Sequence, residues 1–297
     1  MKRRRKVTLF DVLNLFILLC FTFACTFPFY FMFINTISDT SEIVRGNVTF
    51  LPRGVHFLNY LNVFRTPAIW NAAAVSIART AIGTLLKLAM CSFFAYLMTK
   101  REMFMRTLFY RLLVITMYFS AGLIPWYITM INLGLKDNFL LYILPIALTA
   151  FNVILIKTFI DEIPPSMEES AMLDGAGTLS IYWKILMPLC KPILATIAIF
   201  SSVEHWNSFQ DNLFLVHNPD LQTLQMLLYR YMRQVESFAN MIRTQGIGSV
   251  AYTGGYTPNP MAIRMTTSII VVFPIILVYP FMQKHFVKGI MMGAIKG

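Results

Sequence analysis

Two short polar stretches in this apolar chain have residue types that could do chemistry. The first contains Glu204, His205, Trp206 and Asn207, with Gln210 one turn further. A carboxylate within an apolar span costs about 2.5–3.5 kcal/mol on insertion scales and usually faces a cavity. Trp206 offers a stacking face, and Asn207 and Gln210 offer hydrogen bonds, as a hydrated pathway for a polar solute needs. Alternatively, these side chains hold neighbouring helices together.

Other polar residues lie within apolar runs. Trp126 and Asn152 are weaker candidates for the same pathway. Arg79 and Lys87 could each snorkel or pair with a carboxylate such as Glu204. The sequence contains no H-E-x-x-H pattern, no triad-like grouping, no CxxC pair and no G-x-x-x-x-G-K-[ST] loop. We therefore predict no catalytic residue, no metal ligand and no cofactor bound by this chain.

The second polar stretch is "EESAMLDGAG", residues 168–177. Pro164 and Pro165 should stop the preceding helix, and Ser166 with Glu169 has the spacing of a capping box. A short helix would follow and end at Gly175 in a left-handed cap. A second short helix would run from near Thr178 to Pro188. The stretch therefore predicts a helical hairpin over 161–190, either an ordinary connection or a docking element.

Composition places these stretches in a membrane protein. The chain is 57% hydrophobic and 13% charged, whereas soluble domains are about 45–50% apolar and about 25% charged. Its net charge of +11 does not indicate a nucleic-acid partner, because a nucleic-acid binder would not place its basic residues between apolar runs of about 20 residues.

Hydropathy predicts an all-α membrane protein with six transmembrane helices in one domain, residues 1–297. The predicted spans are 12–37, 69–98, 108–131, 138–160, 191–214 and 265–283. Lysines and arginines are concentrated in the N-terminal tail, in the connections after the second and fourth spans, and in the C-terminal tail, which predicts that both termini are cytoplasmic. Segment 215–264 would then be extracytoplasmic, with a helix in its first half.

The hairpin resembles the permease signature of ATP-binding-cassette (ABC) importers, in which E-A-A, three residues, G, nine residues and I-x-L-P follow one another. The matching residues are Glu169, Ser170, Ala171, Gly175, Ile185, Leu186, Met187 and Pro188. Two departures, Ser170 for alanine and Met187 for leucine, are conservative in size. Stretches such as "FSAGLIPWYITMINLGLKDN" and "KPILATIAIF" resemble carbohydrate-importer permeases of the maltose-transporter inner-membrane type, in the lipoprotein-associated oligosaccharide branch.

The resemblance implies a multi-pass permease in the cell membrane of a prokaryote, surrounded by lipid. Its partners would be a second homologous permease, two ATPase subunits that bind ATP and magnesium, and an extracytoplasmic solute-binding protein. The substrate would be a carbohydrate, and an oligosaccharide fits the branch. The hairpin would be the coupling helix that contacts an ATPase. The implied coupling residues are Glu169, Ser170, Ala171, Asp174, Gly175, Ala176, Ile185 and Pro188.

Several alternatives stay open from the sequence. The chain could import a non-sugar solute, or it could be an ion-coupled secondary transporter, although we find no repeated halves of the kind that class often has. A membrane-embedded enzyme would need a catalytic cluster that we do not find. Arg230, Arg233 and Arg243 either indicate an acidic, uronate-containing sugar or form a solvated or lipid-facing basic surface.

Overall fold

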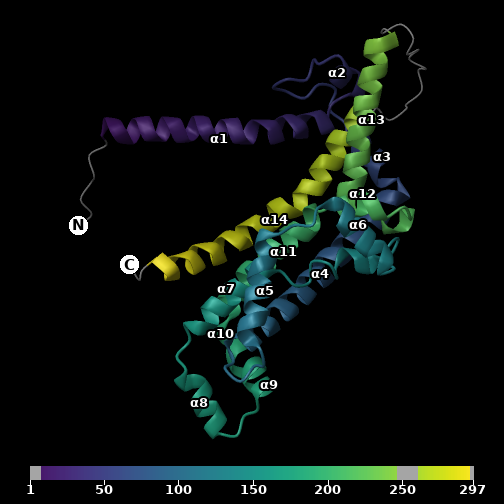
Figure 1. Cartoon of the computed structure of the whole chain (residues 1–297). Helices are drawn as coiled ribbons and strands as arrows, with labels where there is room; N and C mark the ends of the chain where they lie inside the picture. Colours follow the sequence, from purple (N-terminus) through teal and green to yellow (C-terminus); the bar gives the residue numbers. More distant parts are fainter. Residues whose placement is uncertain (1–7, 246–259, 295–297) are drawn as a thin grey trace. The chain divides into compact units, whose positions relative to one another are not determined.

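The computed structural model describes residues 8–245 and 260–294. Within these ranges every regular element is helical and none is a strand, which confirms the predicted all-α fold (Figure 1). The chain divides into two compact units. The first consists of Met1–Pro67 with Leu228–Phe273, and the second of Ala68–Leu227 with Pro274–Gly297.

The first unit contains a long apolar helix and short elements at its carboxyl end. Its helices are α1 (Leu9–Thr36), α2 (Thr40–Val44), α3 (Leu58–Phe64), most of α13 (Leu224–Gln245) and the start of α14 (Pro260–Ala294). Most apolar side chains of α1 are exposed, as expected of a helix that faces lipid. Only its last turn is buried, where Ile34 packs in a small core with Ile43, Val48 and Ala262.

The second unit holds both polar stretches. In chain order its elements are α4 (Pro67–Thr99), α5 (Arg106–Tyr118), α6 (Leu123–Asn132), η1 (Phe139–Tyr142), α7 (Ala150–Asp161), α8 (Ser166–Leu173), α9 (Thr178–Ile181), η2 (Tyr182–Leu186), α10 (Met187–Leu189), α11 (Lys191–Asn207), α12 (Gln210–Leu215) and η3 (Pro219–Leu221). Helix α4 is 33 residues long. Its buried residues recur every three or four positions, so one face of this helix packs along the unit.

Some predicted spans are continuous helices. Three described helices are long and apolar enough to cross a membrane: Leu9–Thr36, Pro67–Thr99 and Met261–Pro280. They correspond to the predicted spans 12–37, 69–98 and 265–283. A fourth is formed when Thr178–Leu189 and Lys191–Leu215 are taken together, although the two parts are bent by 79°. The predicted span 191–214 lies in the second part of this pair.

The predicted spans 108–131 and 138–160 are interrupted. The first is divided into α5 and α6, because Gly122 has a φ of +83° and the chain before it is extended. In the second, only a 3-10 turn precedes Ala150. Pro145 lies in that gap and has no backbone N–H to continue a helix. A smaller break separates α11 from α12, where Ser208 is extended.

The hairpin differs from its prediction at its start. Helix α8 begins at Ser166, but its N-cap is Pro165 and no side chain caps it, so the predicted capping box of Ser166 and Glu169 is wrong. Because Pro165 occupies the N-cap, Ser166 already lies inside the first turn. The second arm continues through Pro188 to Leu189, and a π-helical turn, η2, ends at Leu186, two residues before the proline. Such a turn accommodates a residue that cannot donate a hydrogen bond and whose ring crowds the preceding turn.

Candidate coupling hairpin and polar pathway face

Gly175 makes the turn of the hairpin. Its φ of +80° is left-handed, a conformation that costs a glycine little. Its N–H donates to Met172 O at 3.0 Å, and Ala176 N–H donates to Ala171 O at 2.9 Å. This pair of bonds is a Schellman motif, which closes the end of α8. The left-handed cap predicted at Gly175 is therefore confirmed, and the turn fixes the direction in which α9 leaves.

The predicted coupling residues divide into two groups. Glu169, Ser170, Asp174 and Gly175 are exposed, together with Pro188. Ala171 is buried in a core that also contains residues of α4, α7 and α11, and Ala176 and Ile185 pack against the same core. The exposed group can contact another protein, whereas the second group holds the hairpin against its own chain.

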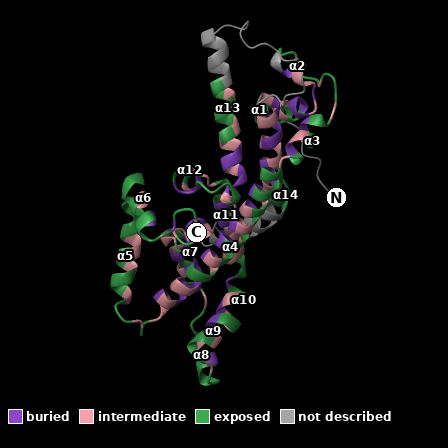
Figure 2. Cartoon of the chain, turned by 90° about the vertical axis from the view of Figure 1, so that its right-hand side faces the viewer, coloured by how far each residue is buried: buried purple, intermediate pink, exposed green. Residues whose placement is uncertain are grey.

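The hairpin also exposes large apolar side chains that sequence reasoning did not select. On α8 these are Met167, Met172 and Leu173, and the second arm adds Leu179 and Trp183. Leu173 is 90% exposed. Figure 2 shows how little of α8 is buried. Exposed apolar clusters of this kind mark interaction sites. The available signal in the sequence was the pair Met172-Leu173 directly before a polar turn.

Glu204 forms an ion pair with Lys87. Lys87 Nζ on α4 lies 2.6 Å from Glu204 Oε2 on α11, which confirms the partner considered for Glu204. The lysine side chain is 1% exposed and the glutamate side chain is 50% exposed. The ion pair thus neutralises the buried Lys87 ammonium, while half of the Glu204 side chain remains exposed.

His205, the next residue on α11, is also directed at α4 and is buried there. A Cβ built on Gly83 would lie only 2.3–2.7 Å from three atoms of the His205 ring, so this position requires a glycine. Trp206 is half-buried and lines an apolar hollow of about 80 Å³ with Thr80, Ser202 and Val203 of α4 and α11 and with part of α14. Because its ring packs directly against Gly83, His205 is a helix-packing residue in this structure.

The other predicted pathway residues lie in different surroundings. Asn207 is exposed, and its Oδ1 accepts a hydrogen bond from Gln225 Nε2 at 3.1 Å. Gln210 is exposed at the start of α12. Trp126 is half-buried on α6, and Asn152 is buried on α7. Because Glu204 and Asn207 are three residues apart on one helix, they share an exposed face, which we call the pathway face.

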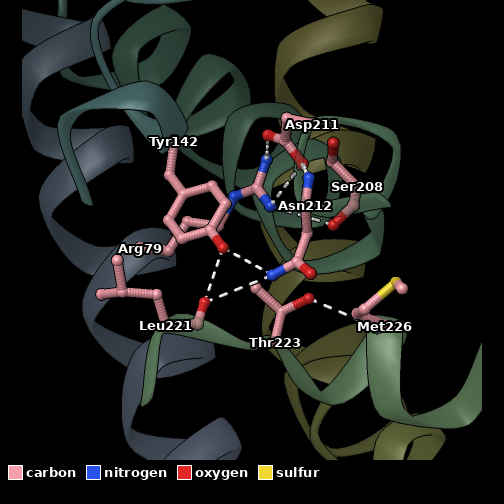
Figure 3. A network of polar contacts seen from close by, with 8 residues as sticks. All are labelled: Arg79, Tyr142, Ser208, Asp211, Asn212, Leu221, Thr223 and Met226. Carbon is pink, nitrogen blue, oxygen red and sulfur yellow. Dashed lines mark hydrogen bonds and ion pairs between the residues drawn. The ribbon is translucent and has the colours of Figure 1, made fainter. Parts of the chain in front are cut away.

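A buried polar network fixes the end of this face (Figure 3). The Arg79 guanidinium makes a two-pronged contact with the Asp211 carboxylate and also donates to Ser208 O at 3.0 Å. It lies 4.6 Å from the centre of the Tyr142 ring. Asn212 Nδ2 donates to the Tyr142 hydroxyl, which donates to Leu221 O at 2.6 Å. The network joins α4, η1, α12 and η3. Sequence reasoning considered a carboxylate partner for Arg79 but did not identify Asp211.

Long apolar helices and a hairpin that exposes apolar side chains are features of a membrane protein with a docking surface. Residues 90–292 match the family described as binding-protein-dependent transport system inner membrane component, and the chain belongs to this family. It is therefore a multi-pass inner-membrane permease subunit, as the hairpin signature predicted.

Individual relatives agree with this assignment. The chain is 35% identical to the polygalacturonan/rhamnogalacturonan transport system permease protein YtcP of Bacillus subtilis (strain 168), over 98% of this chain and 100% of YtcP. It is 34% identical to protein LplC of the same organism, over 97% of this chain and 95% of LplC. The fold matches the crystal structure of a bacterial ABC transporter involved in the import of the acidic polysaccharide alginate, with a TM-score of 0.84, 29% identity, and 96% and 99% of the two chains covered.

Proposed function

We propose that this chain is one of two permease subunits of an ATP-driven carbohydrate importer and crosses the membrane six times, with both termini in the cytoplasm. The helices α1, α4 and α14 and the bent pair ending at Leu215 supply four crossings. The interrupted segments 108–131 and 138–160 supply the other two, since freed backbone groups can be satisfied inside the protein or by a water-filled cavity. The segments 38–68 and 215–264 then face a solute-binding protein.

Coupling to ATP hydrolysis is assigned to the hairpin. The observation that carries this assignment is the exposure of Leu173, beside Met172, on a short helix that follows a polar break in the apolar spans. The acidic residues Glu169 and Asp174 flank these side chains and are exposed as well. An ATPase subunit that covers this surface would bind ATP and magnesium itself, and this chain would hold neither.

Co-purification with the partner ATPase tests the assignment. Leu173→Asp should abolish ATPase binding, because an anchor residue at an interface contributes about 2 kcal/mol or more, or about thirtyfold in affinity. Since Leu173 is 90% exposed, the change should leave membrane insertion unaltered. Gly175→Pro and Glu169→Lys should also uncouple transport. Glu162→Lys, just outside α8, is the control. Normal coupling in all three hairpin variants would refute the assignment.

The substrate is proposed to be an acidic oligosaccharide. The name of YtcP gives polygalacturonan and rhamnogalacturonan as its substrates, and the solved importer takes up the acidic polysaccharide alginate. Within this chain, the pathway face offers Glu204 and Asn207 as hydrogen-bonding groups, which suits sugar hydroxyls. Helix α13 exposes Arg230 and Arg233 three residues apart, and Arg233 lies 3.5 Å from Glu236. The side chain of Arg243 lies outside the described residues.

Reconstitution with the cognate solute-binding protein tests the substrate. Oligogalacturonides should stimulate ATP hydrolysis by the complex, and neutral oligosaccharides of the same length should not. Stimulation by neutral sugars alone would refute the acidic class, and stimulation by a non-sugar solute would refute carbohydrate import. Uptake by the lone chain, driven by an ion gradient, would instead identify a secondary transporter.

A further inference from the structure

Helix α4 contacts the hairpin through three polar residues on one of its faces. Ser92, Tyr96 and Lys100 follow one another at intervals of four, so their side chains lie along one stripe. Ser92 Oγ lies 2.8 Å from the Tyr182 hydroxyl on η2. The Tyr96 hydroxyl donates to the Thr178 carbonyl oxygen on α9 at 3.1 Å. Lys100 Nζ, just past the end of α4, donates to Glu168 on α8. The three contacts thus reach both arms of the hairpin.

These contacts are shielded from water. Tyr96 and Tyr182 are fully buried, and their rings stack with centroids 5.3 Å apart. The side chains of Lys100 and Glu168 are 12% and 22% exposed. Lys100 Nζ also lies 4.5 Å from the centre of the Tyr96 ring. Partly buried charge pairs are screened less than surface pairs, so this ion pair resists separation.

The pKa of Lys100 agrees with a persistent ion pair. Burial by itself lowers this pKa, but hydrogen bonds to Glu168 and Tyr96 and the charge of Glu168 raise it more, and the pKa lies above its ordinary value. The lysine therefore stays charged at neutral pH, and the contact to α8 persists there.

The same helix contacts the pathway face further along its length. Lys87 binds Glu204, Gly83 packs against His205, and Arg79 binds Asp211. Between Arg79 and Lys100 the helix advances about 30 Å at 1.5 Å per residue, and it contains no interior proline. One continuous helix thus contacts the hairpin at one end and the polar residues of α11 and α12 at the other.

The chain segments that join the hairpin to α7 and α11 are not continuous helices, unlike α4. Residues 162–165, between α7 and α8, are not helical, and the chain bends by 79° between Leu189 and Lys191. Non-helical segments and bends absorb motion, whereas packed side chains on a continuous helix transmit it.

We propose that α4 is a second connection between the hairpin and the pathway face, with Lys100 and Glu168 as positioning residues that make hairpin movement displace α4. This inference rests on the proposed docking of an ATPase to the hairpin. It assigns functions to Ser92, Tyr96, Lys100 and Glu168 that differ from ATPase binding. Their loss should reduce the efficiency of coupling and leave assembly intact.

Charge exchange in the reconstituted complex tests the inference. The measured quantity is the amount of sugar imported per ATP hydrolysed in proteoliposomes. Lys100→Ala and Glu168→Ala should each lower this ratio by about threefold or more, within the range that coupled contacts produce, while the ATPase still co-purifies. The exchange Lys100→Glu with Glu168→Lys should restore most of the ratio. Lys157→Ala, which removes the ion pair of Lys157 with Asp161 within α7, is the matched control and should leave the ratio unchanged.

The outcomes distinguish a failure of the proposed role of α4 from a failure of the hairpin assignment. A wild-type ratio in the single variants, no restoration by the exchange, or loss of ATPase binding would overturn the role of α4. If Leu173→Asp abolishes ATPase binding in the same experiments, the hairpin assignment still stands. If Leu173→Asp, Gly175→Pro and Glu169→Lys all leave binding and coupling intact, the hairpin assignment on which this inference rests is wrong. Should the alanine variants fail to fold in the membrane, Tyr96→Phe and Ser92→Ala remove the other two hydrogen bonds, and a normal ratio in both would also overturn the inference.

Discussion

The close approach of α4 and α11 at Gly83 can be tested with Gly83→Ala, whose effect on stability should change sign when the His205 ring is removed. A Cβ at position 83 would lie 2.3 Å from Cε1, 2.5 Å from Nε2 and 2.7 Å from Nδ1 of His205. The His205 ring is 1% exposed, so it cannot move into solvent. Gly83→Ala must therefore displace the ring or separate the two helices.

The size of the effect follows from two opposing contributions. Overpacking a closed interior costs about 1–3 kcal/mol. Alanine within a helix is more favourable than glycine by about 1 kcal/mol. With His205 present the clash outweighs this gain, and we expect Gly83→Ala to destabilise. In a His205→Ala background the ring is absent, so the same change should be neutral or stabilising by up to about 1 kcal/mol.

Thermal unfolding of the assembled transporter in nanodiscs measures this cycle. The four proteins are wild type, the two single variants and the double variant. Gly83→Ala should lower the Tm of the wild type, and it should not lower the Tm of the His205→Ala protein. Equal shifts in both backgrounds, or a higher Tm of Gly83→Ala in the wild type, would refute the proposed contact.

Two further predictions concern polar contacts. Arg79→Lys should destabilise by about 1–3 kcal/mol, because lysine cannot reproduce the two-pronged contact with Asp211; a Tm equal to that of the wild type would contradict this. Hydrogen bonds from the backbone N–H groups of Asn218 and His217 lower the pKa of Asp137. Because the folded pKa lies below the unfolded one, this stabilisation is present above about pH 4 and is lost as the pH falls through the folded pKa. Hydrogen exchange of these two amides, corrected for intrinsic rates, should show that loss in the wild type and not in Asp137→Asn, and identical profiles would count against it.

Local features of the hairpin were predictable only in part. Gly175 was identified because a glycine after a short helix has one common function, the left-handed cap, which depends on neighbouring residues alone. The capping box at Ser166 was wrong for a related reason. Its spacing fits the motif, but Pro165 occupies the N-cap instead, and the motif cannot reveal which residue starts the helix.

The interrupted spans show a limit of hydropathy. Segments 108–131 and 138–160 are apolar along their whole length, so a window average treats each as one helix. The breaks at Gly122 and before Ala150 depend on single residues that such an average does not weigh. Gly122 and Pro145 were the available signals.

The sequence by itself determined that this protein is an all-helical membrane permease with a hairpin of the ABC importer type, because composition, hydropathy and a motif of fixed spacing are properties of consecutive residues. The tertiary structure decided which charges meet. Arg79 binds a residue 132 positions away, and Lys87 binds one 117 positions away. It also decided that Ser92, Tyr96 and Lys100 face the hairpin. Such partners are set by the packing of whole helices, and sequence spacing carries no record of that packing.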